Sequence, residues 1–204
     1  MRAILIDWLI DVHLKFKLVA ETMFLTINLI DRYLEKQQIN RKQLQLVGVT
    51  CLFISTKYEE IYPPDLRDFV YVTDKAYTKQ QILEMEGRVL SALNFNITIN
   101  SSYLFLERYT KLINPTKKCY YMARYLLELA LVEYGMLKYS QRNIAASALY
   151  LAGKIMKNSC WNKQMEQNTF FTEAEVRKCA KSLCIILQNA PTSSLNACKR
   201  KYSK

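Results

Sequence analysis

The stretch QLQLVGVTCLFISTKYEEIYPP, residues 43–64, changes character abruptly at Lys57. Its first fourteen residues contain no Asp, Glu, Lys or Arg, and Lys57, Glu59 and Glu60 then follow within four positions. Charged side chains at the end of a buried element need partners, because an unpaired charge removed from water is costly. The double proline that follows prevents a helix from continuing. The stretch therefore predicts a buried helix over 41–59 with charges at its C-terminal end.

A second stretch of the same kind lies 97 positions further on. With that shift, VGVTCLFISTK (47–57) aligns with IAASALYLAGK (144–154), and branched, small, aromatic and lysine positions coincide. Small residues such as Gly48 and Ala145 allow neighbouring helices to approach closely. Each stretch is therefore predicted to be the central helix of its own bundle, in an all-α protein built from two five-helix repeats.

Apolar residues recur at helical spacing along nearly the whole chain, and breakers and capping residues divide the pattern. Thr78, Thr172 and Asn40 each offer a side-chain oxygen to the amides at the start of a helix. The segment INSS (99–102) is the expected linker, which gives domains over 1–98 and 99–204. The expected helices span 1–16, 20–37, 41–59, 64–71 and 78–94, and then 101–113, 116–134, 141–157, 162–167 and 172–189.

The composition favours helices, since half of the 204 residues are hydrophobic and only four are Gly and four are Pro. No run of 18 apolar residues is present to cross a membrane, and MRAILIDWLI lacks the parts of a signal peptide. We therefore expect a soluble, intracellular protein.

The cysteines and the single histidine do not form a metal-binding pattern. No CxxC pair occurs, and His13 is the only histidine, so we expect neither a metal nor a cofactor. His13 is expected on a helix surface. The cysteines are expected to be reduced, small, buried hydrophobes; they are Cys51, Cys119, Cys160, Cys179, Cys184 and Cys198.

The formal charge of +11 lies entirely in the second half of the chain. Residues 1–98 contain 12 Lys+Arg and 12 Asp+Glu, whereas residues 99–204 contain 17 and 6. A basic half is compatible with nucleic acid or with an acidic protein partner. Basic residues scattered over solvated helix faces are the commoner explanation.

Motifs for catalysis are missing from the sequence. There is no P-loop, no GxGxxG and no histidine placed to act as a base. Acidic neighbours such as Glu59 and Glu60, or Glu84 and Glu86, are explained more simply as solvated or interface charges. We therefore expect a protein that is not itself an enzyme.

The first expected helix is apolar on two sides. A helix of this kind is either fully buried or presents one face to a partner, and the sequence leaves both possibilities open. At 100° per residue, one side comprises Ala3, Ile6, Leu9, Ile10 and Leu14, and the other comprises Met1, Ile4, Leu5, Trp8 and Val12.

Several motifs resemble the cyclin box in their order and spacing. They are MRAILIDWL (1–9), IDRYL (30–34), LQLVG (44–48), KYEEIYPP (57–64), FVYVTDKAYT (69–78) and LNF (93–95). LQLVGVT and KFKLVAETM are most similar to mitotic B-type cyclins. The second half is similar more loosely, through YLLELALVEY (125–134) and IAASALYLAGK (144–154). The resemblance covers the whole chain and implies two tandem five-helix cyclin-box repeats.

The resemblance implies a regulatory subunit that binds and activates a cyclin-dependent serine/threonine kinase and helps to recruit substrates in cell-cycle control. It also implies a location in the nucleus or the cytoplasm, or both. The helix that precedes the first repeat in related cyclins, and the destruction box, are expected outside this sequence.

A nucleic-acid-binding module similar to the core of transcription factor IIB is the alternative, because it has the same two-repeat fold and the second half is basic. The sequence lacks a recognisable recognition helix and a preceding zinc ribbon. Salt would distinguish the two, since DNA binding weakens steeply as salt is added.

Two residues are similar to those with which cyclins contact the C-helix region of the kinase. Lys57 and Glu86 resemble the lysine and glutamate that hydrogen-bond to the kinase backbone. The apolar floor expected between them consists of Ile54, Leu90, Phe95 and Ile97, with Glu59 and Glu60 at its edge. An ordinary charge cluster at a helix end is the alternative explanation.

The second stripe of the first helix resembles the hydrophobic patch with which cyclins dock RxL-type segments of substrates or inhibitors. Trp8 would line the groove and Asp11 would attract the arginine, although packing in the core remains an alternative. The expected patch consists of Met1, Ile4, Leu5, Trp8, Asp11, Leu44 and Gln45. Arg2 and Asp31 resemble a pair that forms a buried structural salt bridge between two helices.

Overall fold

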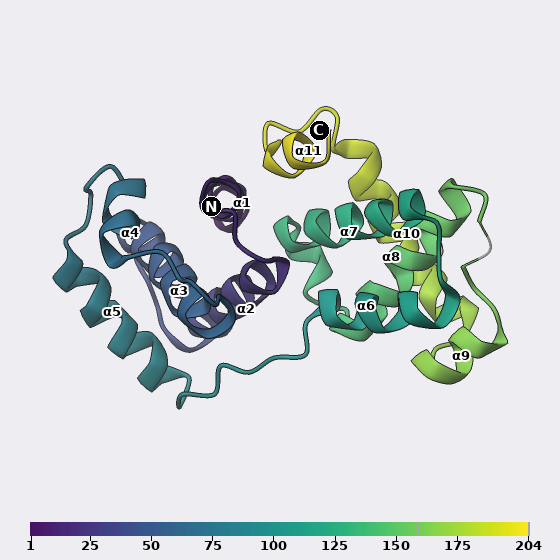
Figure 1. Cartoon of the computed structure of the whole chain (residues 1–204), viewed down its shortest axis with the longest axis horizontal. Helices are drawn as coiled ribbons and strands as arrows, with labels where there is room; N and C mark the ends of the chain where they lie inside the picture. Colours follow the sequence, from purple (N-terminus) through teal and green to yellow (C-terminus); the bar gives the residue numbers. More distant parts are fainter. Residues whose placement is uncertain (159, 204) are drawn as a thin grey trace. The chain divides into compact units, whose positions relative to one another are not determined.

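The uncharged stretch folds into helix α3 (Leu44–Glu59), and every side chain from Leu46 to Thr56 is buried. Helices α1 (Arg2–Phe16), α2 (Ala20–Lys36), α4 (Leu66–Val72) and α5 (Lys79–Ala92) pack around it (Figure 1). A short 3-10 helix, η1 (Arg41–Gln43), leads into α3. Together these elements form the unit Met1–Ile99.

The second unit, Asn100–Lys204, repeats this plan. Its central helix is α8 (Gln141–Ile155), which packs against α6 (Ser102–Ile113), α7 (Lys117–Val132), α9 (Lys163–Thr169) and α10 (Glu173–Asn189) (Figure 1). A 3-10 helix η2 (Tyr134–Met136) follows α7, and a short helix α11 (Ala197–Tyr202) packs against α7. The computed structural model describes residues 1–158 and 160–203. All regular structure in those residues is helical, which confirms the predicted all-α fold of two tandem repeats.

Small residues make both central helices possible. A Cβ added at Gly48 would lie 2.7 Å from Leu5 Cδ1 of α1, and one at Gly153 would lie 2.7 Å from the Asn158 carbonyl oxygen. Ala145 and Ala146 of α8 have no exposed surface. Because interiors are packed at crystal-like density, these positions set how closely a neighbouring helix, or at Gly153 the segment that follows α8, can approach.

Capping residues fix where several helices begin. Thr78 and Thr172 form capping boxes with Gln81 and Glu175, and Asn40 accepts a hydrogen bond at the start of η1. Helix α4 starts at Leu66 rather than at 64, because the Asp65 side chain caps it. Helix α11 was not predicted.

The expectation that His13 lies on a helix surface is wrong. Helix α1 ends at Phe16, and the next residue, Lys17, has a left-handed φ of 55°. His13 is buried, and its Nε2 lies 2.9 Å from the Val19 carbonyl oxygen. Five of the six cysteines are also buried, as small hydrophobes should be, and Cys184 is half-buried.

Among the described helices, none combines the length and the apolar character that a bilayer-spanning segment needs.

Candidate functional site

Helices α3 and α5 bring Lys57 and Glu86 together at the surface of the first unit. Lys57 Nζ lies 2.5 Å from Glu86 Oε1, and the two side chains are 43% and 14% exposed. The ammonium group also lies 4.2 Å from the centroid of the Phe53 ring. Lys57 occupies the last turn of α3, where the helix dipole favours a positive charge. The lysine at the end of the buried helix therefore has a partner within its own chain, and Lys57 itself remains partly accessible.

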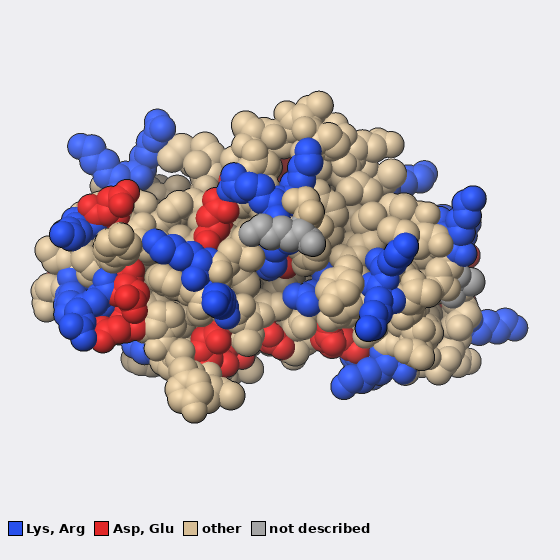
Figure 2. Space-filling view, turned by 45° about the horizontal axis from the view of Figure 1, so that its top comes forward, with Lys and Arg blue, Asp and Glu red and all other residues tan. Residues whose placement is uncertain are grey.

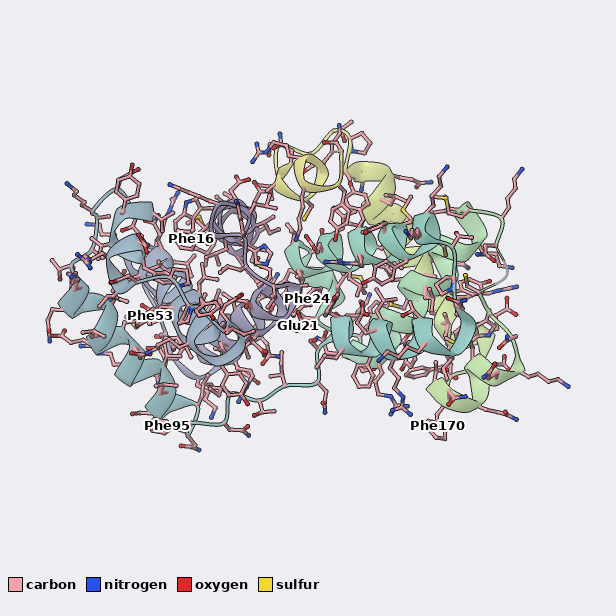
Figure 3. The ribbon with its side chains drawn as sticks, viewed as in Figure 1. Phe16, Glu21, Phe24, Phe53, Phe95 and Phe170 are labelled. Atoms are coloured by element: carbon pink, nitrogen blue, oxygen red, sulfur yellow. The ribbon has the colours of Figure 1, made fainter. Side chains whose placement is uncertain are left out.

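The four apolar residues expected beside this pair differ in exposure. Ile54 is buried in the core, Leu90 and Ile97 are half-buried, and Phe95 is 69% exposed. Figure 3 shows Phe95 beyond the end of α5, apart from Phe53 on α3. Phe95 has a left-handed φ of 55°, and its amide donates a hydrogen bond to the Leu90 carbonyl oxygen at 2.9 Å. An exposed aromatic side chain in this uncommon conformation is a feature that functional sites favour.

The chain that follows α5 is fastened to two other helices. Arg32 of α2 donates a hydrogen bond to the Asn96 carbonyl oxygen at 2.6 Å. The hydroxyl groups of Tyr58 and Thr98 lie 2.7 Å apart. These contacts hold Phe95 and Ile97 in place relative to α3, so that the surface beside the ion pair is formed before any partner binds.

Glu60 has a role within the unit that the sequence did not indicate. Its Oε1 accepts hydrogen bonds from the Val19 amide at 2.9 Å and from the Thr22 hydroxyl at 2.6 Å. It therefore caps the start of α2 with the residue that follows α3. Glu59 is half-buried beside it, and burial, followed by the nearby Glu21 and Glu60 carboxylates, raises the pKa of Glu59.

Ile61 and Tyr62 are the exposed residues that sequence reasoning missed. They are 87% and 91% exposed, in the turn between α3 and α4. Exposed apolar side chains that lie next to each other can mark a protein interaction site. The signal in the sequence was two apolar residues placed between a pair of glutamates and a pair of prolines.

A groove of about 300 Å³ lies where α1, η1 and the start of α3 meet. Met1 and Ile4 are exposed on its α1 side, whereas Leu5 is buried beneath it. Six of the seven expected patch residues line the groove, and Asp11 does not. Arg41 lines it instead, so the charged residue at the groove is a cation that the sequence analysis did not include. The full lining consists of Met1, Ile4, Leu5, Trp8, Arg41, Leu44 and Gln45.

The structure places Arg2 and Asp31 together between α1 and α2. Arg2 Nε lies 2.6 Å from Asp31 Oδ1, and Arg2 Nη2 lies 2.7 Å from Oδ2. Both side chains are largely removed from solvent. This bidentate geometry fixes direction as well as distance, and it therefore holds α1 in a defined orientation beside the groove.

Some of the basic residues of the second unit have partners within the unit. Lys201 Nζ and the Tyr202 hydroxyl each lie 2.7 Å from Oε1 of the buried Glu128, which fastens α11 to α7. On the face in Figure 2, Lys and Arg side chains are scattered, with Asp and Glu among them. No group of three potential metal-binding side chains occurs among the residues that the structure describes.

Family models and related proteins agree with this architecture. The model for the cyclin N-terminal domain matches residues 1–98, and the model for the cyclin C-terminal domain matches residues 101–204. These matches cover both halves and do not favour the alternative similar to transcription factor IIB.

Among curated relatives, Cyclin-B2-1 of Arabidopsis thaliana is 47% identical over 204 residues, which are 100% of this chain and 48% of that protein. G2/mitotic-specific cyclin-B of Marthasterias glacialis is 44% identical over 100% of this chain and 53% of its own length. The chain thus spans about half the length of the curated relatives it matches.

Solved structures share the fold at lower sequence identity. A viral cyclin from herpesvirus saimiri has a TM-score of 0.82 and 21% identity, covering 92% of this chain and 84% of that one. A chain of the yeast RNA Pol II CTD kinase CTDK-1 complex has a TM-score of 0.76 and 16% identity, covering 97% of this chain and 67% of that one.

Proposed function

Because the chain belongs to the cyclin family, we propose that it is a B-type regulatory subunit that binds and activates a cyclin-dependent serine/threonine kinase. The kinase performs the chemistry, and this chain moves the kinase C-helix inward and helps to order the activation loop. The observation that carries the proposal is the Lys57–Glu86 pair at the surface of the first unit, together with exposed apolar side chains on the segments that follow α3 and α5.

The proposed kinase-facing surface has a polar pair and several apolar contacts. Lys57 donates hydrogen bonds and Glu86 accepts them, so together they match the carbonyl and amide groups of a kinase backbone. Ile61, Tyr62 and Phe95 supply apolar area that is exposed in the free chain. A surface with apolar anchors and a few charges at its edge is typical of protein interfaces.

The existing ion pair prepares this surface for binding. In the free chain Glu86 holds the Lys57 ammonium group in place, and Phe53 supports it from the ring face. Two long side chains that are already ordered lose less conformational entropy when a partner binds. Glu59 and Glu60 belong to the edge of the same surface, where Glu60 keeps the turn after α3 attached to α2.

The groove on α1 is proposed to dock RxL-type segments of substrates or inhibitors. Its lining is apolar, and its volume of about 300 Å³ suits one or two apolar side chains of an extended segment. Arg41 repels a neighbouring arginine and attracts a carboxylate. We therefore infer that the docked segment enters with its arginine directed away from Arg41.

Stimulation of a kinase tests the proposed function. The chain is added to purified cyclin-dependent kinase catalytic subunits, and phosphorylation of a short peptide substrate is measured at physiological ionic strength. We expect at least one kinase to be stimulated. At the same ionic strength, where exposed charges are screened beyond about 8 Å, we expect no sequence-specific DNA complex. A DNA footprint without stimulation of any kinase would overturn the assignment.

A further inference from the structure

Two buried cysteines of the second unit lie in contact. The Sγ atoms of Cys119 and Cys160 are 3.3 Å apart, although the two residues are separated by 41 positions in the sequence. Both are free thiols, and the two residues are 0% and 3% exposed. Neither residue takes part in the proposed kinase-facing surface or in the groove on α1. The pair is therefore a cluster of reactive groups that the proposed function does not use.

The two cysteines come from different elements. Cys119 lies in the first turn of α7, where its amide donates a hydrogen bond to the hydroxyl oxygen of the capping residue Thr116. Cys160 lies outside any helix, between α8 and α9. Gly153 of α8 makes room for it, since an added Cβ would lie 2.7 Å from Cys160 Cβ and 2.9 Å from its Sγ. The glycine thus allows Cys160 to occupy the position in which its sulfur meets Cys119.

We propose that Cys119 and Cys160 form a reversible disulfide when the protein is exposed to hydrogen peroxide. The sulfur atoms of a disulfide lie about 2.05 Å apart, so these two need to approach by roughly 1.3 Å. Cys160 makes this movement more easily than Cys119, because no helix holds its backbone. The bond would tie the start of α7 to the segment that follows α8. The inference does not depend on binding to a kinase.

Cys160 is the thiol expected to react first. Hydrogen bonding from the Cys119 thiol lowers the pKa of Cys160, although burial acts in the opposite sense. The same hydrogen bond, together with burial, raises the pKa of Cys119. The thiolate is the nucleophilic form of cysteine, so Cys160 is the better nucleophile of the two. Local opening of the segment between α8 and α9 gives peroxide a route to it, whereas Cys119 is enclosed by its helix.

The oxidation proceeds in two steps. The Cys160 thiolate attacks one oxygen of hydrogen peroxide, the O–O bond breaks, and the products are a sulfenic acid and hydroxide. The Cys119 sulfur then attacks the sulfenic sulfur, so that the S–S bond forms as the S–O bond breaks, and the Cys119 proton leaves with the hydroxide as water. In sum, two thiols and one hydrogen peroxide give one disulfide and two water molecules. Each sulfur loses one electron, and the peroxide gains both.

Peptide mapping of the oxidised full chain tests the inference. The chain is treated with hydrogen peroxide, the remaining thiols are blocked with N-ethylmaleimide in denaturant, and the chain is digested with trypsin. Mass spectrometry should find the peptide 119–124 linked to the peptide 158–163. Two of the six thiols should be lost to the blocking reagent, and dithiothreitol should restore both.

The disulfide should also stabilise the fold. Because the bond restricts the unfolded chain, the Tm of the oxidised chain should exceed that of the reduced chain by about 4–16 °C. Cys119→Ala and Cys160→Ala should each lose both the linked peptides and this increase. Cys184→Ala is the matched control, since Cys184 is the half-buried cysteine and this variant should keep both.

Three results would overturn the inference. One is oxidised wild-type chain without the linked peptides, including chain in which Cys160 is a sulfinic acid beside a free Cys119. Another is linkage of either peptide to a different cysteine. The third is a link between two copies of the chain, seen as a dimer in non-reducing electrophoresis. All three are read from the wild-type chain, so they stand even if a variant fails to fold, and none of them affects the proposed function.

Discussion

Lys57 and Glu86 are paired with each other in the free chain, so their replacement should affect the proposed kinase binding and the stability of the chain differently. Replacing both with alanine should weaken kinase binding by about 2–5 kcal/mol, because charged hydrogen bonds that become buried at an interface are lost. The free energy of unfolding should fall by less than about 1 kcal/mol, since the pair is partly exposed in the free chain. Calorimetry measures the first quantity and urea denaturation measures the second.

The ion pair of Arg177 with Glu173 provides the control for this double substitution. Its atoms lie 2.9 Å apart on the exposed side of α10. Alanine at both of these positions should leave kinase affinity unchanged. If the two double variants lose affinity equally, or if neither does, Lys57 and Glu86 are not part of the interface.

Glu59 makes the stability of the chain depend on pH. Burial and two neighbouring carboxylates raise its pKa in the folded state. Stability from a group with a raised folded pKa is present below the unfolded pKa and is lost as the pH rises through the folded value. Glu59→Gln should therefore increase the free energy of unfolding at pH 7, with no difference below about pH 4. Urea denaturation at both pH values measures this, and an equal increase at pH 4 would contradict the explanation.

At the residue scale, contacts could be predicted from the sequence only where both residues belonged to a recognisable motif. The resemblance named Arg2 with Asp31 and Lys57 with Glu86, and each pair lies in contact. The bonds from Glu60 to α2 could not be predicted, because they join positions about 40 apart and no periodicity relates them. Arg41 was missed at the groove because it lies in η1, before the apolar part of α3.

At the scale of elements, α1 serves the core and the groove with different faces. Ile6, Leu9 and Ile10 are fully buried, whereas Met1 and Ile4 are exposed. Trp8→Ala should therefore abolish binding of an RxL peptide and phosphorylation of substrates that need docking. Activity toward a short peptide without the motif should be preserved. Fluorescence anisotropy with a labelled RxL peptide and kinase assays with both substrates measure these effects.

Ile4→Ala keeps this prediction testable if Trp8→Ala unfolds the chain. Ile4 is exposed, so its truncation leaves the core intact while it removes apolar surface from the groove. Asp11 is outside the lining and provides the comparison, since Asp11→Asn should have a smaller effect on the peptide than either substitution. Full peptide binding by folded Trp8→Ala and Ile4→Ala variants would show that the groove is not the docking site.

The helices were predictable where apolar periodicity and a capping residue agree. Helix α5 begins one residue after Thr78, and α10 begins one residue after Thr172, both predicted as caps. Helix α11 was missed because it has six residues, three of them basic, and too few turns to show a period. It is held in place by contacts with the buried Glu128, which lies more than 70 positions earlier in the sequence.

At the scale of the whole molecule, the repeat was visible in the sequence because each unit needs the same kind of central helix. A helix surrounded by others carries charges only near its ends and requires small residues where its neighbours approach, and α3 and α8 both meet this requirement. The excess of basic residues in the second half was equally visible in the sequence, but the contacts that these residues make could not be predicted from it. Sequence counts do not reveal that a lysine such as Lys201 bonds to a buried glutamate within its own unit.

The capping of α2 by Glu60 has a mechanical consequence. One carboxylate oxygen of Glu60 accepts hydrogen bonds from both Val19 and Thr22. The turn after α3 is therefore held against the first turn of α2. A displacement of Ile61 or Tyr62 would therefore be resisted by the two hydrogen bonds between Glu60 and α2. The most exposed apolar side chains of this unit therefore follow directly on a residue that is anchored to α2 as well as to α3.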